Sequence, residues 1–291
     1  MKGASALWYA NWRKRRAIRT TILRASAYAF TTGLAVLYTI PTLWMVISSL
    51  KNPKELTRLP PTLVPEVIVW RNYIDAFVFL PFNLFVKHSA IYVTLSIVGT
   101  CISCTLVAYG FARLRFRGRD ALFGLVLATM MLPPQVTLIP KYILFRNLGW
   151  IDTLKPLVVP TYFGDAFYIF LLRQFFLSVP LEMDEAALID GANRFDIFWR
   201  ILLPLAKPIV VTIVAFEFIK RWNDFMGPLI YLNSLQKMTV SVGLRQYQAV
   251  EDPHYELMMA ASVMSLVPIV AVFFAAQRYF VASVTMTGIK G

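Results

Sequence analysis

A charged segment between two long apolar stretches carries the residues of this chain best suited to contacting another molecule. Within positions 180–208, three acidic residues between 182 and 185 precede or accompany the paired alanines Ala186 and Ala187. Acidic residues favour the positive amino-terminal end of a helix. Alanine adds helix propensity without bulk, so that a partner surface can approach closely. We therefore expect a short helix that offers its surface for docking.

The rest of this segment predicts a turn and a second helix. Gly191 predicts the end of the first helix, because glycine readily adopts a positive φ. Asn193 is a good N-cap for the second helix, and Pro204 marks its end. Apolar residues at three-to-four spacing predict one stripe on this helix: Phe195, Phe198, Ile201 and Leu202. The segment thus predicts a helix–turn–helix knob. An amphipathic loop lying on a membrane surface remains the alternative on these grounds alone.

Composition places the chain in a membrane. Of its 291 residues, 58% are hydrophobic and 15% charged, whereas soluble domains have about 45–50% apolar and about 25% charged residues. The net charge of +13 lies beside apolar runs, where basic residues orient helices against the membrane. No basic groove interleaved with aromatic residues is present, so we expect no nucleic-acid partner.

Apolar runs long enough for membrane helices occur about six times. A spanning helix needs about 20 apolar residues. The runs are 25–50, 89–112, 121–140, 156–172, 208–225 and 257–276. The fourth contains Asp165, and the fifth contains Glu217 and further charged residues, which normally face a bundle interior or an aqueous path. We predict an all-α membrane protein with about six transmembrane helices.

The placement of lysine and arginine predicts the orientation. If both termini are cytoplasmic, the inside segments carry 17 of these residues and the outside segments 10. The inside segments are 2–24, 113–119, 173–207 and 278–290, and the outside segments are 51–88, 141–155 and 226–256. The positive-inside rule then puts segment 180–208 in the cytoplasm. We expect two regions, a basic cytoplasmic segment 1–24 and a transmembrane domain 25–291.

The charged segment also matches a known pattern. Glu185-Ala186-Ala187 is followed after three residues by Gly191, after nine more by Ile201, and after one more by Leu-Pro204. This resembles the cytoplasmic coupling loop of permease subunits of bacterial ATP-binding-cassette importers. Other stretches resemble the carbohydrate branch of that family, its maltose-transporter-like permeases: 108–116, 131–140, 170–176, 222–225, 243–246 and 277–281.

The resemblance implies a type I importer permease fold, with a coupling helix between the fourth and fifth membrane helices. We call residues 180–208 the coupling segment. The residues implied to dock on an ATPase are Glu185, Ala186, Ala187, Asp190, Gly191, Ile201 and Pro204. The implied partners are a second permease subunit, two ATPase subunits, an extracytoplasmic solute-binding protein and the lipid of the bacterial inner membrane.

The chain has no Gly-x-x-x-x-Gly-Lys-Ser/Thr phosphate cradle. We therefore expect a transport subunit rather than an enzyme, with no cofactor of its own, and ATP and Mg²⁺ bound by the separate ATPase. Its solutes would be sugars or related polyols and glycerol-phosphate compounds. A permease for a non-carbohydrate solute is the alternative. A stand-alone channel or a secondary carrier is a further alternative, but neither class accounts for the coupling segment.

Trp222, Asn223 and Asp224 are candidates for the solute path, because polar groups beside an aromatic ring suit sugar hydroxyls and the apolar faces of sugars. In the alternative, Trp222 anchors the outer membrane interface, and Asp224 pairs with Arg221 or Lys220.

The remaining reactive residues predict no metal or catalytic site. Cys101 and Cys104 have C-x-x-C spacing but lie inside an apolar run, where small residues at a helix contact are the expected interpretation. His88 and His254 are the only histidines, and both fall near the predicted outer side.

Overall fold

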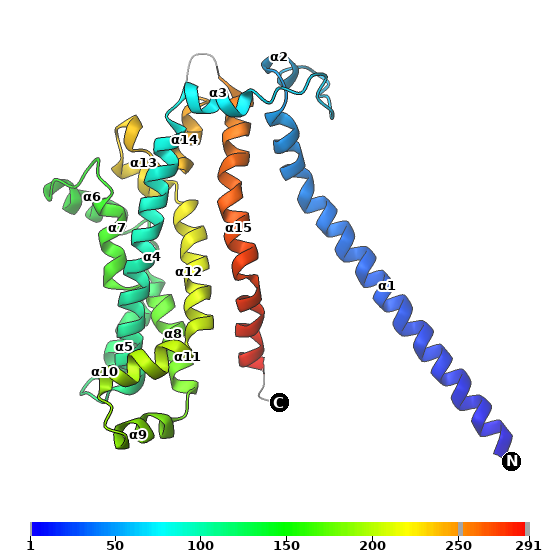
Figure 1. Cartoon of the computed structure of the whole chain (residues 1–291), viewed down its shortest axis with the longest axis vertical. Coiled ribbons are helices and arrows are strands. Elements are labelled where there is room, and N and C mark those ends of the chain that lie inside the picture. Colours follow the sequence, from blue (N-terminus) through cyan, green and yellow to red (C-terminus); the bar gives the residue numbers. More distant parts are fainter. Residues whose placement is uncertain (1, 250–252, 289–291) are drawn as a thin grey trace.

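Helices make up all the regular structure in the part of the chain that the computed structural model describes, residues 2–249 and 253–288, with side chains from 19 to 249 and from 253 to 278. The longest are α1 (Lys2–Ser49), α4 (Phe82–Arg113) and α15 (Tyr255–Gly288). Figure 1 shows α4, α12 and α15 running along the long axis, whereas α1 slants away from the bundle. The all-α prediction is confirmed.

Helix α4 lies at the centre of the bundle. It packs against α8 (Ala166–Ser178) and α12 (Lys207–Trp222), and α12 packs in turn against α15. At Gly99 the 3-10 helix η2 (Val159–Phe163) comes so close that a Cβ would lie 2.6 Å from the Thr161 hydroxyl. A larger residue there would therefore push η2 away from α4.

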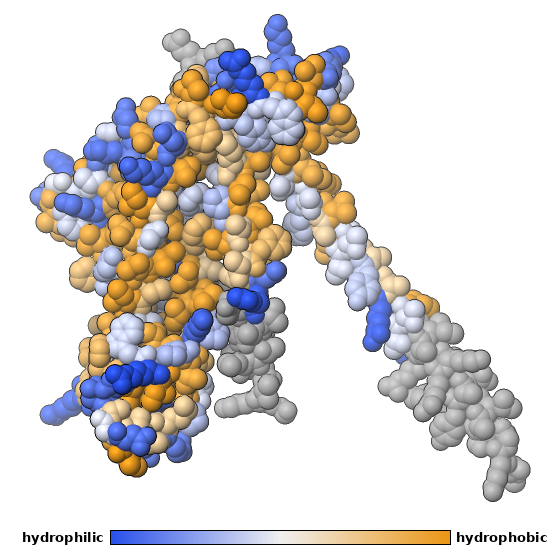
Figure 2. Space-filling model, viewed as in Figure 1, coloured by the Kyte–Doolittle hydropathy of each residue, from blue (hydrophilic) through white to orange (hydrophobic). Residues whose placement is uncertain are grey.

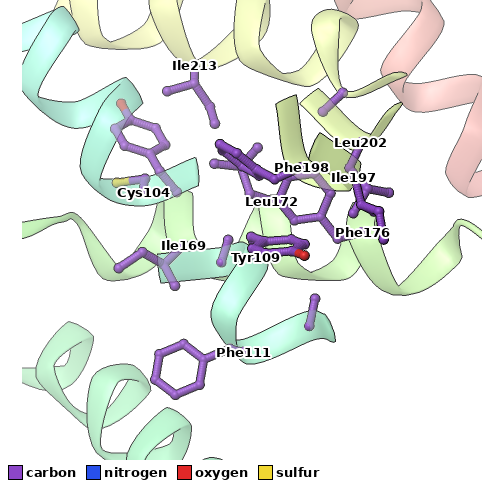
Figure 3. Packing of buried hydrophobic residues seen from close by; sticks show 14 of the residues in the cluster. Cys104, Tyr109, Phe111, Ile169, Leu172, Phe176, Ile197, Phe198, Leu202 and Ile213 are labelled. Carbon is purple, nitrogen blue, oxygen red and sulfur yellow. The ribbon is translucent and has the colours of Figure 1, made fainter. Parts of the chain in front are cut away.

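One hydrophobic cluster joins the lower part of α4 to α8 and to the coupling segment. Its buried members include Tyr109, Leu172, Phe176, Phe198 and Leu202, which Figure 3 shows packed around one another. The coupling segment is therefore held by the same core as the spanning helices.

Cys104 belongs to this cluster, and its Sγ accepts a hydrogen bond from the Asp165 backbone N–H at 3.3 Å. The interpretation of Cys104 as a small residue at a helix contact is confirmed. Cys101 is half-buried and free.

Two predicted spans are interrupted. The stretch 121–140 is divided between α5 (Arg119–Ala128), the 3-10 turn η1 (Thr129–Met131) and α6 (Leu138–Asn147). Pro133 and Pro134 explain this break, because the residue before a proline is disfavoured in the helical region.

The stretch 156–172 begins as α7 (Lys155–Val158) and η2, then breaks at Gly164, whose φ is +90°. Asp165 starts α8 as its N-cap, accepting a hydrogen bond from Phe167 N–H at 3.0 Å. Asp165, the charged residue within this apolar run, thus begins a new helix.

By length and composition, three helices of the described residues can cross a membrane: Arg19–Ser49, Phe82–Arg113 and Tyr255–Arg278. Two bent pairs, 155–189 and 194–222, raise this number to five if each is one span. Figure 2 shows mainly apolar surface over the middle of the bundle and polar residues towards its two ends, the distribution expected of a membrane protein.

Short helices gather at the upper end in Figure 1, opposite the coupling segment. They are α2 (Pro53–Leu56), α3 (Asn72–Phe79), α13 (Met226–Tyr231), the 3-10 turn η4 (Leu235–Lys237) and α14 (Val240–Gln246). These elements belong to the segments that the charge distribution predicts to lie outside.

Asp152 connects its own loop to the loop of Ser234 and Lys237 at the upper end of the molecule. Its carboxylate pairs with Lys237 Nζ at 2.8 Å and accepts hydrogen bonds from the backbone and hydroxyl of Ser234. These bonds hold the pKa of Asp152 well below its usual range, so the carboxylate remains charged at neutral pH.

The predicted boundary between residues 24 and 25 coincides with no break in the backbone, because α1 runs from Lys2 to Ser49. The side chains of residues 2–18, which include most of the basic amino-terminal cluster, lie outside those described. From Ile22 to Leu43 many large apolar side chains of α1 are exposed, among them Tyr28 and Tyr38. No other described part of the chain covers them.

Candidate functional site

The first half of the coupling segment forms a helix with a well-defined end. Helix α9 (Leu181–Ile189) ends with Asp190 as its C-cap, and Gly191 follows with a φ of +86°. The Gly191 N–H bonds to Leu188 O at 3.1 Å and the Ala192 N–H to Ala187 O at 2.9 Å. This is the Schellman arrangement, which needs a left-handed residue at the position of Gly191. The predicted helix end is confirmed.

The second half begins at Asn193, as predicted. The Asn193 side chain accepts hydrogen bonds from the backbone N–H groups of Phe195 and Asp196, and the Asp196 side chain accepts one in return, forming a capping box. Helix α10 (Arg194–Asp196), the π-helix η3 (Ile197–Leu202) and α11 (Leu203–Leu205) follow. The chain then bends by 73° into α12.

The predicted apolar stripe is only partly correct. Phe198 and Leu202 are buried and Ile201 is half-buried, but Phe195 is 62% exposed, and Ile197 is buried in its place. The physical reason is the π-helix, whose wider turn shifts which residues share a face.

Five of the seven predicted coupling residues are exposed to solvent. Glu185, Ala186, Asp190, Gly191 and Pro204 are exposed, whereas Ala187 is buried in the core cluster and Ile201 is half-buried. A larger residue at 187 would therefore disturb the packing of α9 against the bundle. The loss of packing inside the protein would differ from a direct block of the surface that a partner protein contacts.

The tip of the coupling segment is unusually apolar for an exposed end. Ile189 is 87% exposed, and Leu181, Met183 and Leu188 are exposed as well. In Figure 1 α9 lies at the lower extremity of the bundle. Exposed apolar residues edged by Glu185 and Asp190 are typical of a protein interaction site.

Sequence reasoning missed how α9 is attached to the bundle. Asp184 is buried and pairs with Arg113, the last residue of α4. In the sequence Arg113 belongs to a basic cluster that indicates only orientation. The one available signal was the three-residue spacing that puts Asp184 on the same face of α9 as Ala187.

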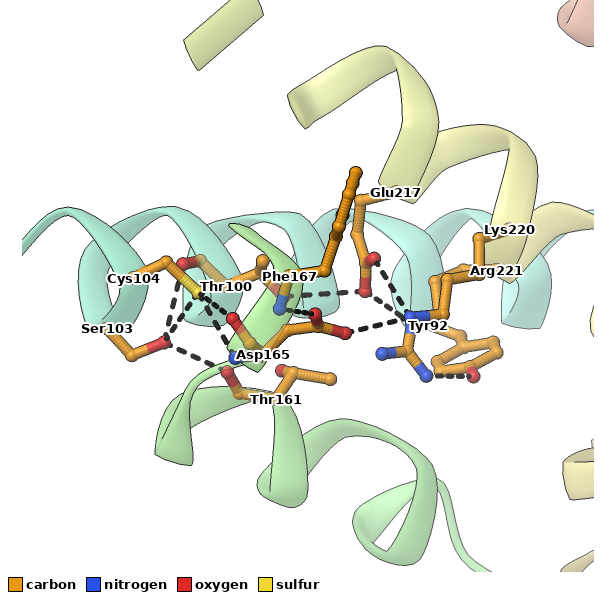
Figure 4. Close-up of polar contacts among 10 residues, drawn as sticks. All are labelled: Tyr92, Thr100, Ser103, Cys104, Thr161, Asp165, Phe167, Glu217, Lys220 and Arg221. Atoms are coloured by element: carbon orange, nitrogen blue, oxygen red, sulfur yellow. Dashed lines mark hydrogen bonds and ion pairs between the residues drawn. The ribbon is translucent and has the colours of Figure 1, made fainter. Parts of the chain in front are cut away.

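A second polar site lies where α4, α8 and α12 meet nearer the upper end. Glu217 is fully buried and pairs with Arg221, one turn further along α12. Lys220 pairs with Asp165 at 3.0 Å and so joins α12 to α8. Figure 4 shows these groups converging beside Tyr92. Asp165 therefore connects two helices of the bundle.

The Tyr92 hydroxyl stands between Arg221 and Asp224. It accepts a hydrogen bond from Arg221 Nη1 at 3.2 Å and donates one to Asp224 Oδ2 at 2.8 Å. The Gly227 N–H bonds to the other carboxylate oxygen of Asp224 at 3.2 Å. The Asp224 side chain is therefore held by neutral donors, in contrast to the predicted pairing with Arg221 or Lys220.

These groups line a cavity of about 430 Å³. Its lining includes Tyr92, Lys141, Asp165, Arg221, Asp224 and Tyr231. Of the predicted solute-path residues, only Asp224 lines it. Trp222 is buried against α15 and donates to Ser265 O at 3.1 Å, and the exposed Asn223 bonds to Ile219 O at the end of α12. Three adjacent residues in the sequence thus point in different directions.

An all-helical bundle with interrupted spans, a protruding segment and a cavity among its helices is typical of a membrane transport protein. Residues 102–286 match the family described as the inner membrane component of binding-protein-dependent transport systems. The chain belongs to this family, and it is a permease subunit rather than an enzyme.

Three relatives show the breadth of this similarity. The arabinooligosaccharides transport system permease protein AraQ of Bacillus subtilis is 30% identical over 95% of this chain and 99% of its own length. The inner membrane ABC transporter permease protein YcjP of Escherichia coli is 31% identical, with coverage of 91% and 97%. The diacetylchitobiose uptake system permease protein NgcG of Streptomyces coelicolor is 30% identical, with coverage of 86% and 84%.

Solved structures support the fold. A chain of a bacterial ABC transporter that imports the acidic polysaccharide alginate superimposes with a TM-score of 0.80, at 24% identity, over 89% of this chain and 96% of that one. A second structure of an alginate transporter, in complex with its pentasaccharide-bound periplasmic protein, gives a TM-score of 0.67 at 15% identity. The ABC importer permease fold is therefore confirmed.

Proposed function

We propose that this chain is a membrane-spanning subunit of an ATP-driven importer for saccharides or related polyols and glycerol-phosphate compounds. The observation that carries this proposal is the coupling segment, a capped hairpin that exposes acidic and apolar residues at one extremity of the bundle. A hairpin of this kind is suited to contact a protein outside the bilayer. Two of the relatives belong by name to transport or uptake systems for arabinooligosaccharides and diacetylchitobiose, which supports a saccharide as the solute.

We infer that the coupling segment faces the cytoplasm. In Figure 1 the start of α1, the end of α15 and α9 all lie at the lower end, and the predicted inside segments carry the larger share of lysine and arginine. Under this orientation the basic segment 1–24 and both termini are cytoplasmic. The short helices at the upper end then face a solute-binding protein outside.

A six-span topology of the type I importer kind follows if α5 and η1 form the third crossing. They cover about 20 Å at 1.5 Å per residue. The irregular stretch before α6 would span the rest of the membrane thickness. Irregular backbone at membrane depth is tolerated where protein or a water-filled cavity surrounds it. The coupling helix α9 then lies between the fourth and fifth crossings.

The proposed partners follow from what this chain presents. The uncovered apolar side chains of α1 support a second permease subunit, with membrane lipid around the pair. Two ATPase subunits would bind ATP and Mg²⁺, because this chain contains no phosphate cradle. Each coupling segment would contact one ATPase. No feature of the sequence supports a nucleic-acid partner.

Transport would result from movement of the coupling segment as one body. The segment leads directly into α12, which ends at the cavity that Arg221 and Asp224 line. Helix α12 has 16 residues, so it carries a displacement over about 24 Å. ATP-driven movement of the ATPases would thus tilt α12 and alternate the access of the cavity to the two sides.

The cavity has the chemistry of a saccharide site. The rings of Tyr92, Phe145 and Tyr231 line it together with the charged groups of Arg221 and Asp224. Aromatic faces pack on the apolar faces of sugars, and charged groups bond to hydroxyls. We infer that Asp224 contacts the solute, whereas Trp222 supports α12 from behind.

Reconstitution tests this function. The chain is to be purified with its second permease and ATPase and placed in vesicles with solute-binding protein. We expect a saccharide-loaded binding protein to stimulate ATP hydrolysis about tenfold and to drive uptake. Stimulation by a non-carbohydrate solute alone would favour the alternative substrate. Uptake by the isolated chain, without an ATPase, would contradict the proposal.

A further inference from the structure

A buried ion pair joins the coupling segment to the central helix of the bundle. Arg113 Nε lies 3.4 Å from Asp184 Oδ2, and the two side chains are 1% and 5% exposed. Arg113 Nη2 also donates to Val179 O at 2.8 Å, just before α9. Arg113 therefore holds both the residue that precedes the coupling segment and the inner face of α9.

Burial makes this pair hard to break. Two charges that have left water are stabilised mainly by each other, and removal of one leaves the other uncompensated. By contrast, in the Asp196–Arg200 pair on the second half of the same segment the Arg200 side chain is 80% exposed and the Asp196 side chain 26%. Exposed pairs contribute little to holding two elements together.

The geometry of the pair is not that of a directional hydrogen bond. Within the described part of the chain, neither Asp184 Oδ1 nor Arg113 Nε has a hydrogen-bond partner, so charge attraction rather than a directional bond connects the two side chains. A cavity of about 700 Å³ adjoins them, and its lining includes Leu114, Leu188, Glu185 and Arg194. Helix α9 thus has room to change its angle while the charges stay together.

Helix α4 leads from this pair to the solute cavity. Arg113 is its last residue, and Tyr92 and Thr100 of the same helix line the cavity. The helix rises about 31 Å between Tyr92 and Arg113, at 1.5 Å per residue. The coupling segment is therefore connected to two walls of the cavity, covalently through α12 and through the ion pair to α4.

We propose that Arg113 and Asp184 are positioning residues that transmit movement of the coupling segment to α4, so that both walls of the cavity move together. The inference rests on the proposed function, because it requires an ATPase to move the segment. Without the pair, α12 would move while α4 lagged behind. ATP would then be hydrolysed with little solute transported.

The test is the double variant Arg113→Met with Asp184→Leu in the reconstituted complex. Replacing both buried charges avoids leaving one unpaired. We expect the ATPase to remain bound and its hydrolysis to stay within about twofold, while solute imported per ATP falls about tenfold. The matched control is Arg119→Met with Asp120→Leu, a more exposed Nε–Oδ1 pair at 3.1 Å at the start of α5, which should leave that ratio unchanged.

An unchanged ratio in the double variant would overturn the proposal. Equal loss of uptake, hydrolysis and ATPase binding would also overturn it, because the pair would then only maintain structure. If the double variant does not accumulate, Asp184→Asn serves instead, since it keeps the size of the side chain and removes the charge that attracts Arg113. We expect that variant to lower the ratio about fivefold, and no change would count against the link. Failure of the unmodified chain to bind an ATPase would refute the proposed function itself.

Discussion

Replacing Gly191 by proline is expected to abolish solute-dependent transport while the chain still inserts into the membrane. Proline fixes φ near −65° and has no N–H, but Gly191 has a φ of +86° and donates to Leu188 O. The turn between α9 and α10 would be lost, and with it the docking surface. We expect uptake to fall about 100-fold, together with loss of ATPase co-purification.

A graded series separates this effect from general damage. A Cβ at Gly191 would meet nothing within 4 Å, so Gly191→Ala adds only the cost of a left-handed residue, about 1–2 kcal/mol, and should retain most uptake. Gly149 has a φ of +68° in an upper loop. Gly149→Pro should therefore leave ATPase binding intact. Normal uptake by vesicles that contain the Gly191→Pro variant would show that transport does not depend on the coupling segment.

Replacing Asp224 by alanine is expected to have the second largest effect, about a 100-fold loss of uptake with the ATPase still bound. The Asp224 carboxylate lines the cavity and is held by Tyr92 and Gly227 at 2.8 and 3.2 Å. Its loss removes an acceptor for solute hydroxyls and releases the Tyr92 hydroxyl. Uptake and ATPase co-purification measured on the same preparation separate a solute role from a coupling role.

Trp222→Phe is the matched control, because Trp222 is two residues away and faces α15. It would lose one hydrogen bond to Ser265 O, a cost of about 1 kcal/mol, and should lower thermal stability slightly. Equal losses of uptake in the two variants would show that the region only supports structure. A larger loss of uptake in Trp222→Phe would indicate that Trp222, and not Asp224, contacts the solute.

The coupling segment could be predicted in detail because its signals are local. Gly191 and Asn193 each specify a backbone conformation that depends on their near neighbours, and both positions are as expected. The position of Phe195 could not be predicted. It depends on the π-helix, and no residue type in 197–202 signals the wider turn.

Long-range contacts explain the other differences. The direction of Trp222, Asn223 and Asp224 is set by how α12 packs between α4 and α15, which the three residues do not encode. In the same way, Arg113 looked like one member of a basic cluster, but burial pairs it with Asp184 across 71 positions of sequence. Charge counting predicts orientation, and it does not distinguish an interfacial arginine from a buried one.

The side of the membrane that α9 faces is tested most directly by labelling with an impermeant thiol reagent. Ile189→Cys is suitable because Ile189 is 87% exposed at the tip of the coupling segment, and Val64→Cys, at 75% exposure on the upper end, is its counterpart. Cys101 and Cys104 would first be replaced by alanine. We expect the Ile189→Cys variant to react only from the cytoplasmic side and to be protected by the ATPase, and the Val64→Cys variant to react only from outside. Labelling of the Ile189→Cys variant in intact cells would contradict the account.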